Sequence, residues 1–250
     1  MQESSRERWN KRADRYARRG IMSKDDEYVV NMLNVYEGDL KKADVLDIGC
    51  GPGIWSLSLV GDVKSITGLD ISDKMIGHAN AKKDEIKAGN ARFHVGDWAK
   101  MEPGKGPLSK KYDIVIMRMT PAIGTIADLQ KAIDVCKGYC FYTSRYSRSH
   151  PLRDVLDAKS GISRYEGHLG FFFEVMRHVA ESGMKPYVSY DSRATDHDYT
   201  IEECVADFQD NYPELGREGV EEIVRCMANG NRVSFRSEMT RITAHWSVPR

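Results

Sequence analysis

Short runs of β-branched and apolar residues alternate with helical stretches along this chain, and this rhythm constrains the fold more than any other feature. The strands are expected at residues 43–49, 64–70, 91–97, 111–119, 138–145, 185–192 and 237–248. Strands that alternate with helices are typical of βαβ units, in which a mainly parallel sheet carries helices on both faces. The sequence therefore predicts an α/β protein with a doubly wound sheet of seven strands.

Helices are expected between these strands and before the first of them. The helical stretches are 4–19, 24–37, 53–61, 71–89, 125–136 and 166–182. The rhythm breaks at 195–236, which we interpret as a helical insertion between strands six and seven, over the sheet edge where ligands bind in such folds. We expect a single domain, 1–250, with an N-terminal helical cap at 1–40, a core at 41–194 and 237–250, and the 195–236 segment as a lid.

Composition disfavours several classes of protein. The 250 residues include 37 Lys and Arg and 37 Asp and Glu, and this balance disfavours a protein that tracks nucleic-acid phosphates. No apolar run reaches the roughly 20 residues of a membrane span, and the amino terminus lacks a secretory signal, so we expect a cytoplasmic protein without a membrane partner. The five scattered cysteines predict neither a disulfide framework nor a metal site; Cys136 and Cys140 are interpreted as a buried thiol pair.

The sharpest motif is a glycine turn that follows the first expected strand and reads D-I-G-C-G-P-G. Glycines at 49, 51 and 53 let a backbone approach a ligand closely, as in nucleotide-binding turns. A dinucleotide fingerprint would place its third glycine where Ile54 stands. Asp47 lies inside the turn, where it would repel a pyrophosphate but would suit an amino group or a sulfonium. The turn therefore favours a cationic nucleoside-type ligand over a dinucleotide.

Two further acids support a nucleoside ligand. Asp70 ends the second expected strand, about 20 residues after the turn, where an acid reaches ribose hydroxyls in doubly wound folds. Asp97 ends the third expected strand, in the sequence Gly96-Asp97-Trp98, where it could contact an adenine amino group while Trp98 or its neighbours pack on the ring. Each acid alone is also explained as a cap or a turn residue, so the prediction rests on the three acids and the turn together.

These motifs resemble a known family. The segments DIGCGPGIWSLSL, GLDISDKMI and FHVGDW are similar to the first three motifs of the class I S-adenosylmethionine-dependent methyltransferases, which have a Rossmann-like sheet. The resemblance runs from Ala43 to Ser144, with the seven-strand pattern continuing beyond it. It implies the strand order 3-2-1-4-5-7-6 with strand seven antiparallel. It also implies S-adenosylmethionine as cofactor and S-adenosylhomocysteine as product.

The resemblance further implies a set of cofactor contacts. The glycine turn would hold the methionine moiety with Asp47 facing its amino group, and Asp70 would take the ribose hydroxyls. Asp97 and the Trp98 amide would bind the adenine edge, and a helical W-x(n)-Y pattern, which recurs in small-molecule members, makes Tyr16 a lid residue. Arg118 would meet either the cofactor carboxylate or an acidic substrate. The expected cofactor residues are Tyr16, Asp47, Gly49, Cys50, Gly51, Gly53, Asp70, Ile71, Met75, Gly96, Asp97, Trp98 and Arg118.

The end of the fourth expected strand bears on the methyl acceptor. Enzymes that methylate exocyclic amines of bases carry a motif resembling [DNS]-P-P-[YF] there, whereas this chain reads Met119-Thr120-Pro121-Ala122. With the balanced charge, this predicts a small-molecule acceptor rather than nucleic acid. The candidate substrate residues are Met119, Arg145, Arg148, His150 and His197. Arg145, Arg148 and His150 are placed in a loop after the fifth strand, and His197 where the insertion opens.

Catalytic candidates are few, because an activated methyl group needs mainly positioning and desolvation of its acceptor. A general base is needed only for an acceptor that arrives protonated. Thr120 either hydrogen-bonds a substrate or caps the helix 125–136, and His168 is a candidate base. Two alternatives stay open: an NAD(P)-dependent dehydrogenase and a non-catalytic cofactor-binding protein of the same fold. The acceptor itself, and a monomeric or homodimeric state, are left open by the sequence.

Overall fold

The computed structural model describes residues 4–18, 20–23, 32, 34–162 and 168–249. Most of the helix expected at 24–37 therefore lies outside the described residues. The chain forms two compact units. Unit 1 comprises Met1–Ser144, Phe171–Ser189 and Thr243–Arg250, and unit 2 comprises Arg145–Gly170 and Tyr190–Ile242. The expectation of one domain with a lid at 195–236 stays a prediction.

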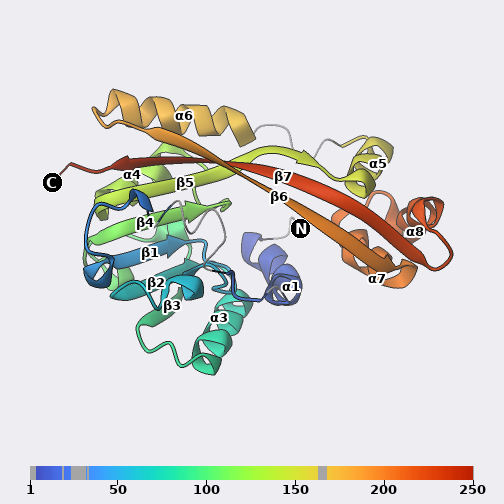
Figure 1. Ribbon diagram of the computed structural model, residues 1–250, viewed down its shortest axis with the longest axis horizontal. Coiled ribbons are helices and arrows are strands. Elements are labelled where there is room, and N and C mark those ends of the chain that lie inside the picture. The colour runs from blue at the N-terminus through green and yellow to red at the C-terminus, as the bar shows by residue number, and fades with distance from the viewer. Residues whose placement is uncertain (1–3, 19, 24–31, 33, 163–167, 250) are drawn as a thin grey trace. The chain divides into compact units, whose positions relative to one another are not determined.

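The sheet has seven strands in the order β3-β2-β1-β4-β5-β7-β6, as expected (Figure 1). The strands are β1 (Asp44–Ile48), β2 (Ser65–Asp70), β3 (Ala91–Val95), β4 (Tyr112–Arg118), β5 (Cys136–Ser149), β6 (Tyr187–Thr200) and β7 (Arg232–Ser247). β1 to β5 run parallel to one another, and the register sets Asp47 of β1 opposite Gly68 of β2. The carboxyl ends of β1, β2 and β4 therefore meet at one edge.

β7 runs antiparallel to both of its neighbours, which confirms the expected direction. The contacts that join it to β5 and β6 are Val248 N to Gly138 O, Thr243 to Thr143, Thr240 to Ser192 and Ser237 to His197. In both sets the residue number falls on one strand as it rises on the other, which is the signature of an antiparallel pair. The opposed arrows of β5 and β7 show the same relation (Figure 1).

Seven α-helices are described with the strands. They are α1 (Ser5–Ala17), α3 (Asp73–Glu85), α4 (Ile126–Asp134), α5 (Pro151–Ser160), α6 (His168–Glu181), α7 (Ile201–Phe208) and α8 (Gly216–Met227). The helix expected at 53–61 is wrong: only Ser56–Leu59 is helical, as the 3-10 helix η2. Gly53 has φ +72°, which a right-handed helix cannot contain, so the turn continues past this glycine.

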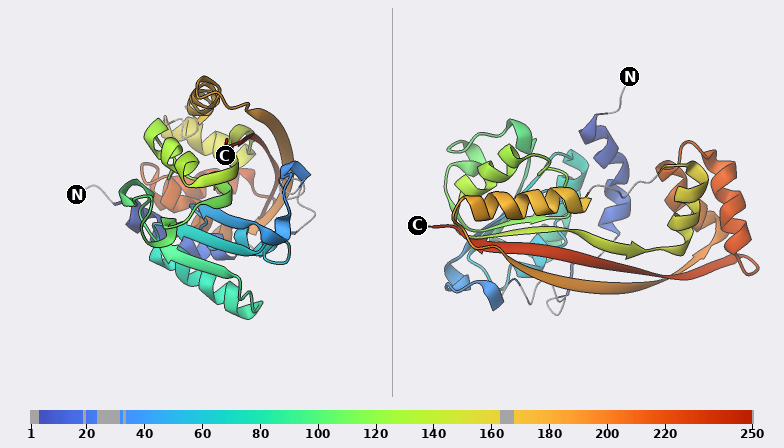
Figure 2. Two further views of the ribbon diagram at one scale, coloured as in Figure 1. Left: turned by 90° about the vertical axis from the view of Figure 1, so that its left-hand side faces the viewer. Right: turned by 90° about the horizontal axis from the view of Figure 1, so that it is seen from above.

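The core of unit 1 lies on both faces of the sheet, because side chains alternate along each strand. Val45 of β1 and Ile116 of β4 belong to one buried cluster with Ile76 and Ala79 of α3. On β5, Phe141 faces this cluster, whereas Tyr142 packs against Phe171 and Phe172 of α6. α6 also reaches α4 through His178 and Gln130. α3 and α6 therefore cover opposite faces (Figure 2).

Unit 2 has an apolar core of its own, made where α5, α7 and α8 pack together. Its buried members include Leu152, Leu156, Cys204, Val205, Tyr212, Val220, Val224 and Val233. Two expectations are wrong here. Residues 145–149 are strand rather than loop, and β6 continues through Thr200 while β7 begins at Arg232, so 195–236 is helical only in its middle. No helix of the part of the chain that the structure describes is long and apolar enough to cross a membrane.

Candidate functional site

The glycine turn after β1 is built from three left-handed glycines. Gly49, Gly51 and Gly53 have φ of +73°, +54° and +72°, a region in which only glycine is free of steric cost. The amides of Gly49 and Cys50 donate to the carbonyl of Leu69 at 2.7 and 3.0 Å. These bonds hold the turn against the end of β2. The G-x-G-x-G spacing in the sequence therefore marks the three positions at which the backbone is left-handed.

The three glycines differ in what a side chain would meet. A Cβ on Gly49 would collide with Thr120, and a Cβ on Gly53 would lie 3.0 Å from the Phe93 ring. A Cβ on Gly51 would have only the Met75 sulfur near it, at 3.9 Å. Packing inside the protein therefore requires a glycine at 49 and 53. At 51 it is the left-handed backbone that requires one, and the space in front of it is open to a ligand.

Asp70 at the end of β2 holds the turn through its carboxylate. One oxygen accepts from the amide of Gly51 at 2.9 Å and the other from the amide of Ser72 at 2.8 Å. Burial raises the pKa of Asp70, and these amide bonds oppose the rise. A carboxylate has about four acceptor positions, so capacity is left for hydroxyl donors of a ligand.

Asp47 is the second acid at the turn and is only 4% exposed. The hydroxyl of Ser56 donates to it at 2.6 Å. Burial raises the pKa of Asp47 to about 6, although the Ser56 bond and the charge of Arg118 lower it. Sequence reasoning missed Ser56, because nothing in the local sequence S-L-S-L shows which serine contacts an acid.

The end of β4 brings Arg118 to the same edge. Its guanidinium carbon lies 3.6 Å from the centre of the Trp55 ring, a cation–π contact. Met119 follows with φ +50°, an uncommon conformation for a residue other than glycine. The Thr120 hydroxyl accepts from the Ala122 amide at 3.2 Å and so supports this turn. Thr125 caps α4, so the alternative in which Thr120 caps that helix is wrong.

The expected adenine-binding segment differs from its prediction in two ways. β3 ends at Val95, and Asp97 instead caps the 3-10 helix η3 (Trp98–Lys100) and contacts Lys100 at 3.3 Å. The Trp98 indole is buried and donates to the carbonyl of Asp128 on α4 at 3.2 Å, so its ring packs there. The Gly96 amide donates to the carbonyl of Asp70 at 2.8 Å, which joins this segment to the end of β2.

Comparisons with known proteins agree with this geometry. Residues 45–139, which hold the turn, both acids and β4, match the family described as methyltransferase domain. The chain contains a methyltransferase domain. The strand order is that of the class I fold expected from the motifs, and solved structures of this fold include one with bound S-adenosylmethionine and one with bound S-adenosylhomocysteine.

Curated relatives of this methyltransferase domain have several named activities. A magnesium-protoporphyrin O-methyltransferase of Rhodobacter capsulatus is 30% identical over 95 residues, 38% of this chain and 42% of that protein. A demethylmenaquinone methyltransferase of Lactococcus lactis is 33% identical over 96 residues, 36% of each chain. A 23S rRNA (uracil-C5)-methyltransferase of Tolumonas auensis is 28% identical over 94 residues, 37% of this chain and 21% of that protein. The chain thus matches less than half the length of these relatives.

Solved structures show the fold more widely. The magnesium protoporphyrin IX methyltransferase of Synechocystis with bound S-adenosylhomocysteine has a TM-score of 0.52 and 16% identity, covering 98% of this chain and 88% of that chain. The precorrin 8w decarboxylase of Methanobacterium thermoautotrophicum has a TM-score of 0.51 and 14% identity, covering 90% and 92%. At such identities the likeness shows the Rossmann-like fold alone.

Other expected cofactor residues belong to the turn itself, to the end of β2 with the start of α3, and to α1. Cys50 and Met75 are buried, and burial raises the pKa of the Cys50 thiol far above its ordinary range. Ile71 follows Asp70 directly. Tyr16 lies on α1, where its ring meets Trp9 edge-on at 5.9 Å. The cofactor contacts of all these residues stay predictions.

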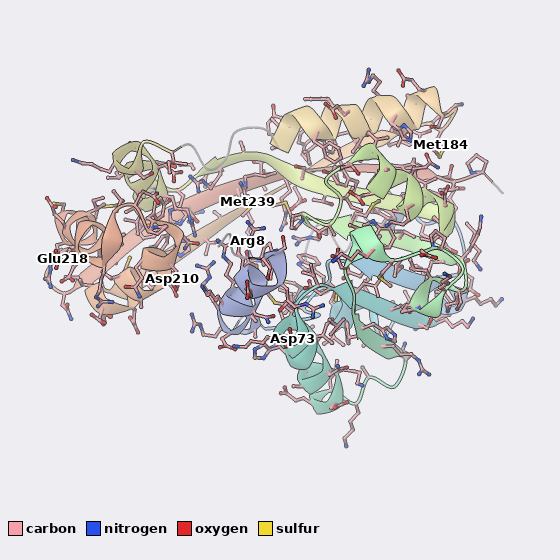
Figure 3. All side chains as sticks on the ribbon, turned by 180° about the vertical axis from the view of Figure 1, so that it is seen from behind. Arg8, Asp73, Met184, Asp210, Glu218 and Met239 are labelled. Atoms are coloured by element: carbon pink, nitrogen blue, oxygen red, sulfur yellow. The ribbon has the colours of Figure 1, made fainter. Side chains whose placement is uncertain are left out.

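α1 is attached to α3 by polar contacts that sequence reasoning missed. Asn10 bonds to Ser72 at 2.6 Å and to Asp73 at 2.9 Å. Asp73 begins α3 beside α1 (Figure 3). Asn10 gives no local signal, because its partners are more than 60 residues away.

Four of the expected acceptor residues lie in unit 2. Arg145 and Arg148 are on β5, and the Arg148 guanidinium contacts Asp154 at 2.9 Å. His150 caps α5, and burial lowers its pKa to about 3. His197 is on β6, and its Nε2 is 2.8 Å from the Ser237 hydroxyl. Met119 belongs to unit 1, and the His168 side chain is outside the described residues, so no substrate role is tested.

The two acids on either side of His197 in the sequence, Asp196 and Asp198, form ion pairs with arginines. Asp196 contacts Arg236 at 3.3 Å, and Asp198 forms a two-pronged bond with Arg232. Among the residues that the structure describes, no group of three or more His, Cys, Asp or Glu is placed to hold a metal ion. The expectation that the chain has no metal site stays a prediction.

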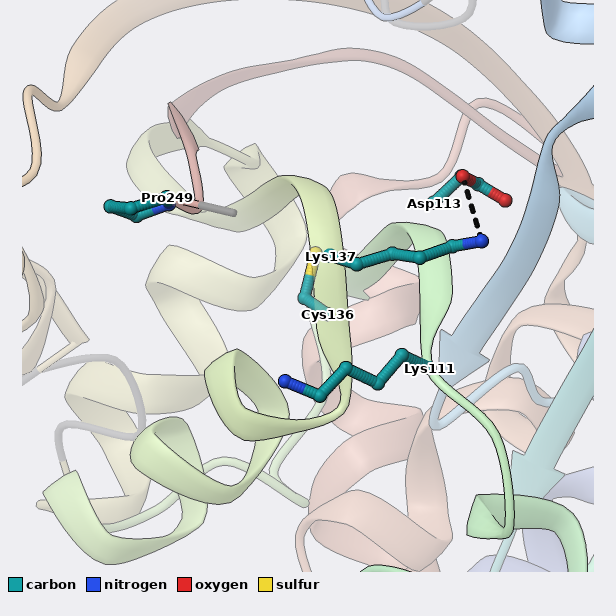
Figure 4. A pocket seen from close by; sticks show the side chains of 5 residues that line it. All are labelled: Lys111, Asp113, Cys136, Lys137 and Pro249. Atoms are coloured by element: carbon teal, nitrogen blue, oxygen red, sulfur yellow. Dashed lines mark ion pairs between the residues drawn. The ribbon is translucent and has the colours of Figure 1, made fainter.

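A pocket lies at the opposite edge of the sheet, where β4 and β5 begin (Figure 4). It is lined by Lys111, Asp113, Cys136, Lys137 and Pro249. Lys137 contacts Asp113 across it at 3.2 Å. Cys136 and Cys140 are both buried at the junction of α4 with β5, as expected. Ligands of such folds bind at the carboxyl ends of the strands, so this pocket is no part of the candidate site.

Proposed function

We propose that this chain is an S-adenosylmethionine-dependent methyltransferase that transfers a methyl group to a small-molecule acceptor. The observation that supports it best is the coupling of a left-handed glycine turn to one buried and one half-buried acid. The Gly51 amide donates to Asp70, and Asp47 lies in β1 just before the turn, where burial raises its pKa. Two acids would repel a pyrophosphate, whereas a ligand with an ammonium, a sulfonium and a ribose suits them.

In this proposal the acids bind the two polar ends of the cofactor. Asp70 would accept from the ribose hydroxyls and Asp47 would face the ammonium group. Arg118, stacked on Trp55 at the end of β4, would attract the carboxylate. When bound, S-adenosylmethionine supplies an activated methyl group. The chain's own contribution is to orient the acceptor and to exclude water around it.

A small-molecule acceptor is favoured by charge and by the end of β4. Lys and Arg balance Asp and Glu at 37 each, and Met119-Thr120-Pro121-Ala122 has neither the polar first residue nor the aromatic of the base-methylating motif. Curated relatives are named for magnesium-protoporphyrin, ubiquinone biosynthesis and demethylmenaquinone, and two others are named for ribosomal RNA. The small-molecule names agree with the composition.

Calorimetric titration with S-adenosylhomocysteine and with NAD tests the proposal. We expect S-adenosylhomocysteine to bind and NAD not to bind. Gly51→Ala should weaken binding at least about tenfold, because its methyl group would stand where the cofactor approaches. A protein that binds NAD and not S-adenosylhomocysteine would overturn the assignment.

Gly183→Ala is the matched control. Gly183 also has a left-handed backbone, φ +78°, with nothing within 4 Å of a Cβ. Both substitutions therefore carry a similar backbone strain of about 1–2 kcal/mol. Only Gly51→Ala should change the affinity. An equal loss of affinity in both variants would show that strain, and not contact with the ligand, is responsible.

A further inference from the structure

The amino end of α3 carries a continuous chain of hydrogen bonds from the glycine turn to α1. The Gly51 amide donates to Asp70, and the Ser72 amide donates to the other oxygen of Asp70. The Ser72 hydroxyl then donates to the side-chain oxygen of Asn10 at 2.6 Å. The first and last links join residues that are far apart in sequence, the middle link joins Ser72 to Asp70 two residues before it, and the chain ends on α1.

Ser72 is the step at which this chain depends on Asn10. It is completely buried, and its hydroxyl oxygen accepts from the Met75 amide at 3.1 Å as the N-cap of α3. A hydroxyl has a single hydrogen, and here that hydrogen goes to Asn10. Without Asn10 this buried donor loses the acceptor that holds it, which is costly inside a protein. Without the Asn10 contact, the Ser72 backbone amide that donates to Asp70 would also be held less firmly.

Asn10 itself is held in one orientation. Its amide nitrogen donates to Asp73 at 2.9 Å, so its oxygen points at Ser72. The hydrogen bond lowers the pKa of Asp73, which keeps that carboxylate charged as an acceptor. Asn10 therefore contacts both the cap and the first residue of α3.

Two further polar contacts between α1 and α3 do not involve Asp70. Asp14 meets His78 at 2.8 Å, and the Ala17 carbonyl accepts from Lys82 at 2.8 Å. The contact residues rise together on both helices, so α1 and α3 run parallel. Among these contacts, those of Asn10 are the ones at the end of α3 that adjoins Asp70.

We propose that Asn10 is a positioning residue, which fixes Asp70 and the Gly51 amide through Ser72 and so couples the docking of α1 to the ribose end of the cofactor site. The part that concerns the cofactor rests on the proposed function. The coupling is reciprocal and acts through this one contact: the Asn10–Ser72 hydrogen bond tightens the turn, and a ligand on Asp70 stabilises that hydrogen bond.

Amide hydrogen exchange, followed by NMR without any ligand, tests the first half. Asn10→Ala should speed exchange at the Gly51 and Ser72 amides. Asp14→Ala loosens α1 at the His78 contact and should leave both amides unchanged. Equal exchange in the wild type and in Asn10→Ala, or the same acceleration in Asp14→Ala, would overturn the proposal.

Titration with S-adenosylhomocysteine tests the second half. Asn10→Ala should bind about tenfold more weakly, and Asp14→Ala as tightly as the wild type. Asn10→Asp alone sets two carboxylates against each other and should also weaken binding. Asn10→Asp with Asp73→Asn exchanges donor and acceptor and should restore it. Restored binding supports the coupling, and failure of this rescue counts against it.

The two proposals fail in different ways. If the wild type does not bind S-adenosylhomocysteine, the proposed function is wrong, and the exchange measurement still decides whether Asn10 holds the turn. If binding is normal in the wild type and unchanged in Asn10→Ala, the positioning role is wrong while the proposed function stands.

Discussion

The two acids of the candidate site and two acids of unit 2 are held by different partners. In unit 1, Asp70 accepts from backbone amides and Asp47 from the Ser56 hydroxyl. In unit 2, Asp191 is bonded to Arg241, and Asp157 contacts Arg148. Burial raises the pKa of both Asp47 and Asp70. Neutral donors hold these carboxylates in place while leaving much of their charge for another group.

In the proposed function, this difference separates acids that bind a ligand from acids that stabilise the fold. An arginine neutralises a carboxylate within the protein, so such a pair gains little from a cationic ligand. A carboxylate held by amide donors is oriented but is not neutralised, so it can still attract a cationic group. Carboxylates of this kind are common in binding sites. Variants that remove acids from each unit test this distinction.

The largest effect is expected for the buried ion pair of unit 2. Asp191 and Arg241 are 4% and 8% exposed. Asp191→Ala should lower the free energy of unfolding by about 3–5 kcal/mol, because it leaves a buried guanidinium without its carboxylate. Urea denaturation followed by circular dichroism measures this loss.

The control for that variant replaces both partners. Asp191→Ala with Arg241→Met should be less destabilised than Asp191→Ala alone, because no buried charge is stranded. Cofactor affinity should not change in either. An Asp191 variant with the same free energy of unfolding as the wild type that fails to bind S-adenosylhomocysteine would contradict the separation of roles.

A smaller effect is expected from the pH dependence of Asp47. Its pKa is about 6 in the folded protein, above the ordinary value of 3.8. The folded state therefore binds more protons than the unfolded state between about pH 4 and 6. Stability from this group should fall by about 2–3 kcal/mol as pH rises through that window and then level off.

Asp47→Asn should remove this contribution. The measurement is the difference between the two proteins' unfolding free energies from pH 4 to 8, since all other titrating groups are common to both. A difference that does not vary with pH would show that Asp47 is solvated as freely as an exposed acid.

The smallest effect is expected at the exposed pair of Asp198 and Arg232. The arginine lowers the pKa of Asp198, but both side chains are more than half exposed, and such pairs contribute little. Arg232→Gln should leave the thermal midpoint within experimental error. A clear loss, removed by high salt, would mean that exposed pairs also hold unit 2 together.

Much of unit 1 was predictable because its signals are local. β-branched runs marked the strands, Ser72 stood where an N-cap belongs, and the G-x-G-x-G spacing located three left-handed residues. Asp70 was identified because it ends a strand beside that turn. Ser56 and Asn10 were missed. Nothing near Ser56 in the sequence indicates its contact with the Asp47 carboxylate, and nothing near Asn10 indicates its contact with the Ser72 hydroxyl.

Unit 2 was harder to predict because its strands are not apolar. Most residues of β6 are exposed, and its sequence Y-V-S-Y-D-S-R-A-T-D-H-D-Y-T lacks the clear alternation of a half-buried strand. Its pairing depends on contacts such as Asp198 with Arg232, 34 residues apart. α5 had local signals that were overlooked, with Pro151 at its first position and the left-handed Gly161 after its end.

The core of unit 2 also dictates when that unit can form during synthesis. Leu152 and Leu156 of α5 pack in the same cluster as Val220 and Val233, which follow more than 60 residues later. At roughly 5–20 residues per second, α5 waits several seconds on the ribosome for these partners. β1, β2, β3 and α3 have many of their partners within residues 44–95. The glycine turn can therefore be in place before the second unit closes.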